Sequence, residues 1–417
     1  MTRHYSALSV LKEGMRGQKG WAQAWRSPQP AKRYAVVIIG GGGQGLATAY
    51  YLAKTHGVKR IAVIERGWLG GGNTGRNTTA IRSNYYYPES TELYDLSLRL
   101  YETLGRDLNY NIMLSQRGMM QIVSSPGEME MAARQVNAMQ LNGVQAELLD
   151  RAEVQRRVPI YNYAPDARYP VYGAIFQARA GIARHDAVAW GYARAADALG
   201  VDIIQQCEVQ GFVVEGGRCV GVQTSRGEIR ADRVGMAVAG SSGVMAEKAG
   251  FRLPITSYTL QACVSEPVKP IFDTVLVSPM TGAYVSQSDK GEMVIGGGLD
   301  RVPSYGQRGN LPQLETVLSG VLEMFPIFRQ LRLLRQWGGT VDVTPDSSPI
   351  FGESPLPGLY INGGWGTGGF KAIPAGGTLF AHILASGGHH PISAPFDLNR
   401  FRTGHLLDEA AGAGIAH

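Results

Sequence analysis

Four glycines and one glutamate stand at a regular spacing after the first apolar run of the chain. The run covers residues 34–39, residues 46–53 have helical composition, and between them lie the glycines Gly40, Gly42, Gly43 and Gly45. A second apolar run, 61–64, ends in Glu65. A strand, a glycine turn, a helix and a strand ending in an acid form the fingerprint of dinucleotide-binding folds. The helix N-terminus would bind the phosphates, and Glu65 would bind the ribose hydroxyls.

The loop after Glu65 favours FAD over NAD as the dinucleotide. An NAD-binding domain would continue with regular strand–helix units, whereas residues 70–79 are polar, rich in glycine and show little helical character. A second glycine-rich loop, 362–371, follows an apolar run at 358–361. Because a glycine backbone can approach a ligand closely, two such loops far apart in the chain suit one long cofactor. We therefore expect an extended FAD whose flavin lies deep in the protein.

The composition narrows the class of protein. A hydrophobic fraction of 44%, a charged fraction of 18% and a formal net charge of +6 are ordinary for a globular protein. The basic excess lies in the first 33 residues, which hold seven Lys or Arg and one acid, Glu13. We interpret this segment as an arm on a partner subunit, with a mitochondrial-type targeting segment as the alternative. Without a nucleic-acid-binding module or a run of about 20 apolar residues, we expect neither nucleic acid nor a membrane as a partner.

The remaining reactive side chains point to no other chemistry. The three cysteines, Cys207, Cys219 and Cys263, are scattered, and no His, Glu or Cys residues have metal-ligand spacing. We therefore expect no metal site, free thiols and a reducing, cytoplasmic location. No Gly-x-Ser-x-Gly elbow supports hydrolysis.

The glycine segments and several others resemble a known family. Residues 35–39, the loop to Thr79 and the segment 364–371 resemble the D-amino-acid-oxidase-like family of FAD-dependent amine oxidases. Within that family, the chain is similar to the beta subunits of heterotetrameric sarcosine oxidases. This narrower resemblance rests on residues 40–54, 76–79, 81–85, 115–118, 180–186, 305–309, 325–328 and 402–408. It covers essentially everything after about residue 33.

The resemblance implies two flavins, a noncovalent FAD and an FMN bound covalently to a histidine. In the family this histidine stands in a Gly-Ile-Ala-Lys-His-Asp pattern, which here reads Gly181-Ile-Ala-Arg-His-Asp, so the attachment falls on His185 and Arg184 replaces lysine. Attachment needs a neutral imidazole, and Arg184 and a helix N-terminus should both disfavour protonation. The alternative is a histidine that only caps the helix. Monomeric relatives attach FAD through a C-terminal cysteine, and none follows Cys263.

The resemblance also implies the residues that bind substrate and flavins. Arg82 and Lys371 match the positions that hold the substrate carboxylate, which two cations bind best in a dry pocket. The alternative for each is a phosphate or surface contact, and Lys371 is expected to contact the flavin as well. The other expected FAD contacts are Asn73, Arg76, Thr78, Ile81, Val209, Gly366 and Gly369. The expected FMN contacts besides His185 are Arg184, Glu292 and Arg335.

These sites require an α/β fold, with a discontinuous Rossmann-like FAD-binding domain and an inserted antiparallel-sheet substrate domain. A chain of 417 residues is long enough for two lobes. The expected division is an arm at 1–33, an FAD-binding domain at 34–90, 180–250 and 345–400, a substrate domain at 91–179 and 251–344, and a tail at 401–417.

The activity implied by the resemblance is oxidative demethylation of sarcosine to glycine. Electrons would pass from FAD to FMN and then to O2, giving hydrogen peroxide. The one-carbon unit would pass to tetrahydrofolate on a large alpha subunit, and two small subunits would complete the heterotetramer. One alternative is the related subunit of a heteromeric L-proline or other secondary-amine dehydrogenase. Another is a noncatalytic flavin subunit that only relays electrons.

Overall fold

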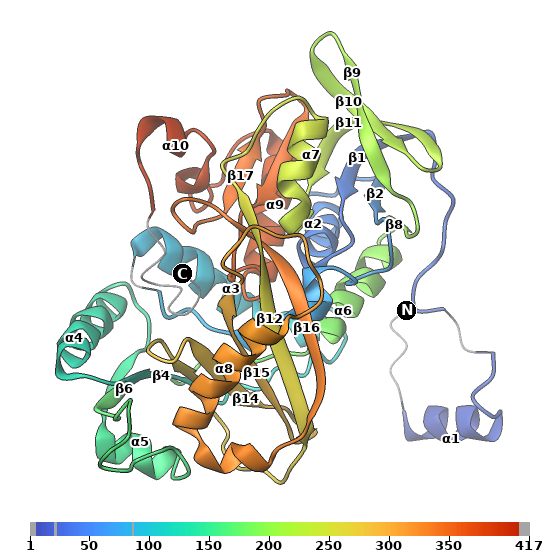
Figure 1. The fold of residues 1–417 in the computed structure, drawn as a ribbon. Coiled ribbons are helices and arrows are strands. Elements are labelled where there is room, and N and C mark those ends of the chain that lie inside the picture. The colour runs from blue at the N-terminus through green and yellow to red at the C-terminus, as the bar shows by residue number, and fades with distance from the viewer. Residues whose placement is uncertain (1–5, 21–22, 86, 408–417) are drawn as a thin grey trace.

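The computed structural model describes residues 6–20, 23–85 and 87–407. In this part of the chain, two eight-stranded sheets lie one beside the other (Figure 1). A third sheet has two strands and pairs residues 80–81 with residues 181–182. The N-terminal residues 1–5 and 21–22 of the expected arm and residues 408–417 of the expected tail lie outside the described residues.

The first sheet carries the glycine turn. Its central strand β1 (Arg33–Ile39) pairs in parallel with β2 (Ile61–Ile64) on one side and with β11 (Gly227–Met236) on the other. The full order is β17 (Ile350–Glu353), β18 (Leu359–Gly363), β11, β1, β2 and β8 (Asp202–Ile204). A hairpin of β9 (Val209–Glu215) and β10 (Arg218–Thr224) extends from β11. The inner strands read as continuous apolar runs because helices cover both faces.

Four helices bury one face of this sheet. They share one hydrophobic core and are α2 (Gly43–Lys54), α3 (Pro88–Asp107), α6 (His185–Ala198) and α9 (Ile373–Ser386). Helices α2 and α9 approach closely, since a Cβ added at Gly377 would lie 2.4 Å from the Cβ of Ala47. The other face packs against α7 (Ser242–Lys248) through Met245 and Ala246.

The second sheet is mainly antiparallel and forms a separate wall. Its order is β16 (Leu333–Val343), β12 (Thr256–Pro267), β15 (Glu292–Leu299), β14 (Ala283–Gln287), β13 (Val275–Ser278), β4 (Met119–Val123), β6 (Gly173–Gln177) and β5 (Glu147–Asp150). Only β13 and β4 pair in parallel. Its core packs against α5 (Arg151–Arg157), α8 (Leu311–Met324) and η3 (Pro326–Gln330), while α4 (Pro126–Leu141) covers a smaller cluster.

The chain passes between the two sheets several times, so the FAD-binding fold is discontinuous. The predicted fold class is confirmed: a mixed α/β protein with an FAD-binding sheet and an antiparallel second sheet. Helix α3 packs in the core of the first sheet although most of it lies after residue 90. The domain boundaries themselves stay a prediction.

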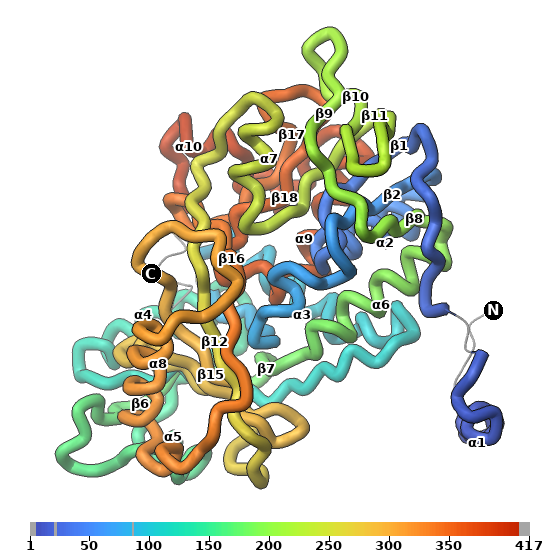
Figure 2. Tube along the Cα trace, turned by 45° about the vertical axis from the view of Figure 1, so that its right-hand side comes forward, coloured from blue at the N-terminus to red at the C-terminus, as the bar shows by residue number. Residues whose placement is uncertain are grey.

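The N-terminal segment leaves the body of the protein. Helix α1 (Ala7–Met15) buries no side chain and stands apart in both views (Figures 1 and 2). Further along, Arg26 donates a hydrogen bond of 2.9 Å from Nε to the Asp197 carboxylate and another of 2.9 Å from Nη2 to the Val201 carbonyl. Residues near Arg26 therefore lie against the chain's own α6 region. None of the described helices is long and apolar enough to cross a bilayer.

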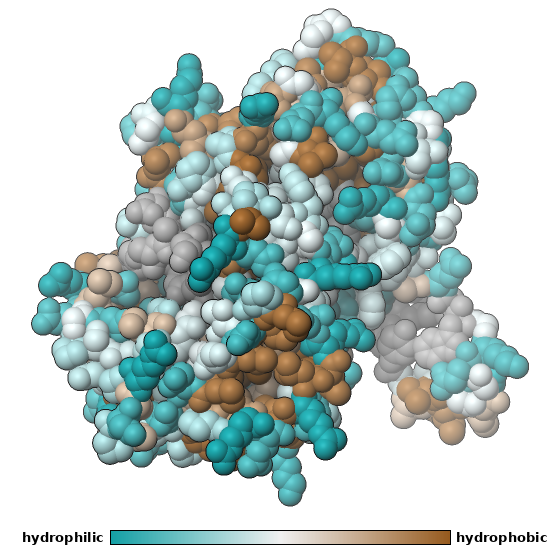
Figure 3. All heavy atoms as spheres, viewed as in Figure 1, coloured by the Kyte–Doolittle hydropathy of each residue, from teal (hydrophilic) through white to brown (hydrophobic). Residues whose placement is uncertain are grey.

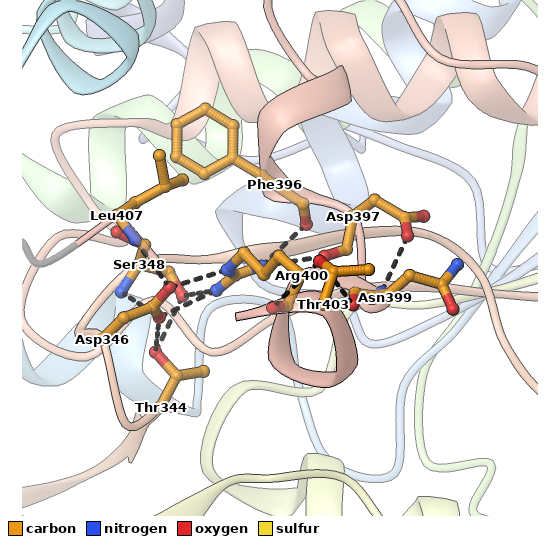
Figure 4. Close-up of polar contacts among 9 residues, drawn as sticks. All are labelled: Thr344, Asp346, Ser348, Phe396, Asp397, Asn399, Arg400, Thr403 and Leu407. Atoms are coloured by element: carbon orange, nitrogen blue, oxygen red, sulfur yellow. Dashed lines mark hydrogen bonds and ion pairs between the residues drawn. The ribbon is translucent and has the colours of Figure 1, made fainter. Parts of the chain in front are cut away.

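A buried ion pair links the C-terminal segment to the connection between β16 of the second sheet and β17 of the first sheet (Figure 4). Arg400, which opens α10 (Arg400–Thr403), donates to the Asp346 carboxylate from Nε at 2.7 Å and from Nη2 at 2.9 Å. Its Nη1 donates to the Phe396 carbonyl at 2.9 Å, and Nη2 also donates to the Ser348 carbonyl. Asp346 lies between β16 and β17. Because every nitrogen of the guanidinium has an acceptor, the charge is tolerated inside the protein.

Candidate functional site

The turn after β1 has the backbone shape that only glycine allows. Gly40 has φ +109°, and a Cβ there would lie 2.3 Å from the carbonyl oxygen of Ala237. A Cβ at Gly45 would lie 2.0 Å from the carbonyl oxygen of Gly40. Helix α2 begins at Gly43, so its first N–H groups face the turn. This is the arrangement that binds a pyrophosphate at a helix N-terminus.

Glu65 closes the same turn at the end of β2. Its carboxylate accepts hydrogen bonds of 2.8 Å from the N–H of Gly41 and of 2.8 Å from the N–H of Gly67. Its carbonyl accepts from the N–H of Cys207 at 2.9 Å. Two residues further on, Val209 begins β9 and is buried. The structure therefore brings Val209 to the Glu65 end of the turn.

A cavity lies beside Gln44 at the start of α2 and is lined by the loop after Glu65, by the second glycine loop and by the second sheet. Seven predicted contacts lie on its wall: Asn73, Arg76, Thr78, Arg82, Gly366, Gly369 and Lys371. Gln44 of α2 also lines it and donates to the Gly369 carbonyl at 2.9 Å. The two glycine loops, separated by most of the chain, thus meet at one cavity, as one long ligand requires.

The loop after Glu65 is held against the second sheet. The indole Nε1 of Trp337 donates to the Arg76 carbonyl at 2.7 Å, and the Asn73 side chain donates to the Thr340 carbonyl. The hydroxyl of Thr78 donates to that of Tyr284 at 3.0 Å. These contacts place the loop between the dinucleotide turn and the apolar residues of the far wall, which include Met119, Leu260, Ala262, Val275 and Val277.

Two buried cations lie on the wall of the cavity. Arg82 is 5% exposed, donates to the Asn84 side-chain oxygen at 2.8 Å, and stacks over the Tyr85 ring at 4.5 Å. Lys371 is 7% exposed, and its Nζ donates to the Thr367 carbonyl at 3.1 Å. Burial, together with the charge of Arg82, lowers the pKa of Lys371 well below its ordinary value. An anion in this cavity would stabilise both charges, and a carboxylate matches them chemically.

The sequence interpretation missed Asp342, a carboxyl on the cavity wall. It is almost fully buried on β16, its Oδ2 accepts from the N–H of Gly364 at 2.6 Å, and its carbonyl accepts from the N–H of Gly366 at 2.8 Å. Burial raises the pKa of Asp342 to about 7. The residue therefore shapes the second glycine loop. The sequence did contain a signal for this residue, because Asp342 is an acidic residue between two valines, Val341 and Val343.

His185 lies at the start of α6, outside this cavity. Its side chain is 26% exposed, and among the described residues Nδ1 has no hydrogen-bond partner. Burial is the main reason that the pKa of His185 is lowered; the charge of Arg184 lowers it further, and Asp186 opposes this. The neutral imidazole expected from the sequence is thus favoured, although burial contributes more than Arg184.

The other predicted FMN residues lie on the second sheet. Glu292 begins β15, and Arg335 lies on β16, on the two sides of β12. Among the described residues, no hydrogen bond or ion pair joins either residue to His185. A shared FMN site therefore stays a prediction. Ile81 is buried on β3 (Ala80–Ile81) and pairs with Gly181 on β7 (Gly181–Ile182), which joins the strand before Arg82 to the segment before His185.

The dinucleotide turn, the second glycine loop and the shared cavity define a flavin-dependent oxidoreductase. The chain belongs to the FAD dependent oxidoreductase family, whose model matches residues 35–383. It is 52% identical over 415 residues to the sarcosine oxidase subunit beta of Rhodobacter capsulatus, covering 100% of each chain. It is 51% identical over 393 residues to the corresponding subunit of an Arthrobacter species, covering 94% of this chain and 97% of the relative.

A solved structure also resembles the fold. L-proline dehydrogenase from P. horikoshii superimposes with a TM-score of 0.85 at 26% identity, covering 91% of this chain and 100% of that one. The predicted resemblance to sarcosine oxidase beta subunits is confirmed by the relatives at 51–52% identity. The chain is therefore a flavin-dependent oxidoreductase that acts on amine substrates. The name of these relatives, subunit beta, indicates a subunit of a multi-subunit enzyme.

Proposed function

We propose that this chain oxidatively demethylates sarcosine to glycine within a heterotetramer. In this proposal electrons pass from FAD to FMN and then to O2, giving hydrogen peroxide, and the one-carbon unit passes to tetrahydrofolate on a large partner subunit. The observation that carries the proposal is the pair of buried cations, Arg82 and Lys371, on a cavity that both glycine loops line.

The described residues fit FAD. A Cβ at Gly40 or Gly45 would collide with the protein backbone, so these glycines permit the tight turn and the close packing of helix and strand that a dinucleotide-binding fold needs. Asn73, Arg76 and Thr78 are the residues that would hold the middle and flavin end of the cofactor, together with the loop at Gly366 and Gly369. When bound, FAD supplies the acceptor for the hydride equivalent removed from the amine.

The chain's own contribution to the reaction is orientation of the substrate. Arg82 can bind both oxygens of a carboxylate, and Lys371 adds a second positive charge. The apolar residues of the far wall exclude water from the amine end of the substrate, which strengthens both charge contacts. Holding the carboxylate in this way leaves the N-methyl group free to face the flavin.

His185 is the proposed attachment point of FMN. A nitrogen of a neutral imidazole has the lone pair that a covalent bond to the flavin requires. The burial that lowers the pKa of His185 supports this role, as does Nδ1, which has no hydrogen-bond partner among the described residues. Arg184, Glu292 and Arg335 are proposed to contact the FMN.

A second candidate is oxidation of L-proline or another secondary amine. The resemblance to an L-proline dehydrogenase at a TM-score of 0.85 favours it. Both substrates carry a carboxylate next to a secondary amine, so the two cations alone do not distinguish them.

Anaerobic reduction of the flavin by each amine tests the proposal. The holoenzyme, made with its partner subunits, is mixed with sarcosine or L-proline, and bleaching of the flavin absorbance is followed. We expect fast bleaching with sarcosine and formation of glycine. Bleaching by L-proline alone would favour the second candidate, and bleaching by neither would favour a subunit that only relays electrons.

A further inference from the structure

One side of helix α3 connects to both cations of the cavity. Tyr94, Ser97 and Tyr101 stand at the spacing i, i+3 and i+7, so they share one side of the helix, and we call these three residues the α3 face. Ser97 and Tyr101 are fully buried, and Tyr94 is 4% exposed. Because buried hydroxyls take hydrogen-bond partners, the partners of this face show what the helix holds.

Two hydroxyls of the α3 face hold the peptide groups on either side of the Lys371 Cα. The Tyr101 hydroxyl donates to the Phe370 carbonyl at 2.6 Å, in the peptide group before this Cα. The Ser97 hydroxyl donates to the Lys371 carbonyl at 2.7 Å, in the peptide group after it. Since each peptide group is planar, fixing both groups also fixes the direction in which the Lys371 side chain leaves the backbone.

A third side chain, from α2, holds the same stretch. Gln44 donates to the carbonyl of Gly369, so the carbonyls of three successive residues, ending with Lys371, each accept a hydrogen bond from a helix side chain. Helix α9 begins two residues later, and the N–H of Ile373 donates to the Phe370 carbonyl at 3.1 Å. The backbone of Lys371 is therefore tied to three helices at the point where this residue lines the cavity.

The α3 face reaches the other cation through aromatic rings. Tyr94 stacks on Tyr85, with ring centroids 3.9 Å apart and ring planes 11° apart. The guanidinium of Arg82 lies over the Tyr85 ring, 4.5 Å from its centroid. Stacked rings and a cation over a ring both favour a defined arrangement. The helix that fixes Lys371 thus also supports the ring that Arg82 contacts.

The alternative is that Ser97 and Tyr101 are ordinary core residues whose hydroxyls are merely satisfied. Tyr192 shows that this core can bury a tyrosine without holding a loop. It is fully buried in the same cluster, and its hydroxyl pairs with that of Tyr51 at 3.2 Å. The α3 face differs because its two hydroxyls bond to consecutive peptide groups around one residue of the cavity.

We infer that the α3 face is a positioning element of the amine site, which sets where Lys371 and Arg82 meet one carboxylate. Ser97 and Tyr101 act through the backbone of Lys371, and the third residue of the face acts through the ring beside Arg82. This inference rests on the proposed function and adds the residues that orient its two cations. Because charge-assisted hydrogen bonds need accurate geometry, a small shift of the Lys371 backbone weakens carboxylate binding.

The test uses the holoenzyme with its FAD and titrates the flavin absorbance with propionate. Tyr101→Phe and Ser97→Ala should each weaken propionate binding by about tenfold, since each removes one hydrogen bond to a buried carbonyl. Ser97→Thr keeps the hydroxyl and should recover part of the affinity. Tyr192→Phe removes an equally buried hydroxyl from the same core, so it is the matched control and should bind propionate like wild type.

The substitutions leave the surface of the molecule unchanged, because all three positions are buried. In the view of Figure 3, exposed apolar atoms gather elsewhere, over α8 and the adjoining lower end of β16. Lost affinity would therefore not come from altered association through that surface. The melting temperature and the flavin-to-protein absorbance ratio of each variant show whether the fold and the cofactor are retained.

The pH dependence of propionate binding is the second readout. Burial, and after it the charge of Arg82, lowers the pKa of Lys371. Burial raises the pKa of Tyr101 well above its ordinary value, so this residue stays neutral throughout. A loosened backbone lets water reach the ammonium, and the pKa of Lys371 then moves up toward its ordinary value. In Tyr101→Phe the affinity should therefore fall at a higher pH than in wild type, whereas Tyr192→Phe should show no such shift.

The outcomes separate this inference from the proposed function. If Lys371→Met binds propionate like wild type, the proposed carboxylate site is wrong and the inference fails with it. If Lys371→Met binds weakly but Tyr101→Phe and Ser97→Ala match Tyr192→Phe in affinity and pH dependence, the carboxylate site stands and the inference is overturned. Similar melting temperatures of Tyr101→Phe and Tyr192→Phe, with weaker binding and a shifted pH dependence only in Tyr101→Phe, are the expected result.

Discussion

The ammonium of Lys371 and the guanidinium of Arg82 lie on the same cavity wall, and the charge of Arg82 helps to lower the pKa of Lys371. Two like charges in a buried site repel each other unless a counter-charge is bound. A bound carboxylate would be attracted by both groups and would oppose the lowering of the Lys371 pKa.

Removal of the Arg82 guanidinium should reduce activity strongly without loss of cofactor. We expect Arg82→Ala to cost about 2–5 kcal/mol in the transition state, since it removes one partner of a buried charge pair. This corresponds to roughly 30-fold to several thousand-fold in kcat/KM for sarcosine. Arg82→Lys should recover only part of the loss, because a point charge cannot bind both oxygens. Steady-state kinetics and the flavin-to-protein ratio check this, and an apoprotein would instead indicate a phosphate contact.

The affinity for a simple carboxylate should fall as the pH rises. Because burial lowers the pKa of Lys371, its ammonium loses its proton at a lower pH than a free lysine does. A carboxylate without an amine, such as propionate, should therefore bind more weakly as the pH rises through this lowered pKa. Spectral titration of the flavin measures this. In Lys371→Met the affinity should be low and nearly independent of pH, and a dependence equal to wild type would remove Lys371 from the carboxylate site.

Replacement of His185 should remove only the covalent flavin. His185→Ala should keep noncovalent FAD and still be reduced by sarcosine, yet lose most of its peroxide production. Flavin fluorescence of the protein band on a denaturing gel reports the covalent bond. His405→Ala, a change at an exposed histidine, is the control and should keep this fluorescence. Full oxidase turnover in His185→Ala would contradict the two-flavin relay.

The carboxyl of Asp342 should make stability depend on pH. Burial raises its pKa from 3.8 to about 7, so the folded protein takes up a proton here between these two values. The stabilisation is complete below the unfolded pKa and is lost as the pH rises through about 7. Compared with wild type, Asp342→Asn should show a flatter dependence of Tm on pH in this window. Calorimetry over a pH series measures this, with Asp232→Asn at an exposed position as the control. Parallel curves for Asp342→Asn and wild type would contradict the prediction.

The buried pair of Arg400 and Asp346 should contribute far more to stability than a surface pair. Arg400→Gln leaves the Asp346 carboxylate without its main partner and should cost about 3–5 kcal/mol in the free energy of unfolding. Arg33→Gln breaks an exposed pair with Asp232 and should cost about 1 kcal/mol or less. Chemical denaturation of both variants measures the difference, and equal costs would show that burial does not matter here.

The sequence alone was sufficient for the dinucleotide turn. The residues from β1 to Glu65 are contiguous, Gly40 is required by its φ of +109°, and Gly45 is required by a collision with the Gly40 carbonyl within the same short segment. A local steric requirement of this kind leaves a local pattern in the chain. The neutral state of His185 was also expected from its neighbour Arg184 and its helix terminus, although the main cause, burial, was not visible in the sequence.

The resemblance had already implied that Arg82 and Lys371 lie together, but only the tertiary structure showed that both are buried on one cavity wall and placed Asp342 beside the second glycine loop. These residues belong to segments far apart in the chain, and their burial depends on how the two sheets pack together. Spacing in a sequence carries information about neighbours along a helix or strand, but not about the depth to which packing buries a charge. For that reason the motifs of the cofactor site could be read from the sequence, whereas the electrostatics of the cavity required the fold.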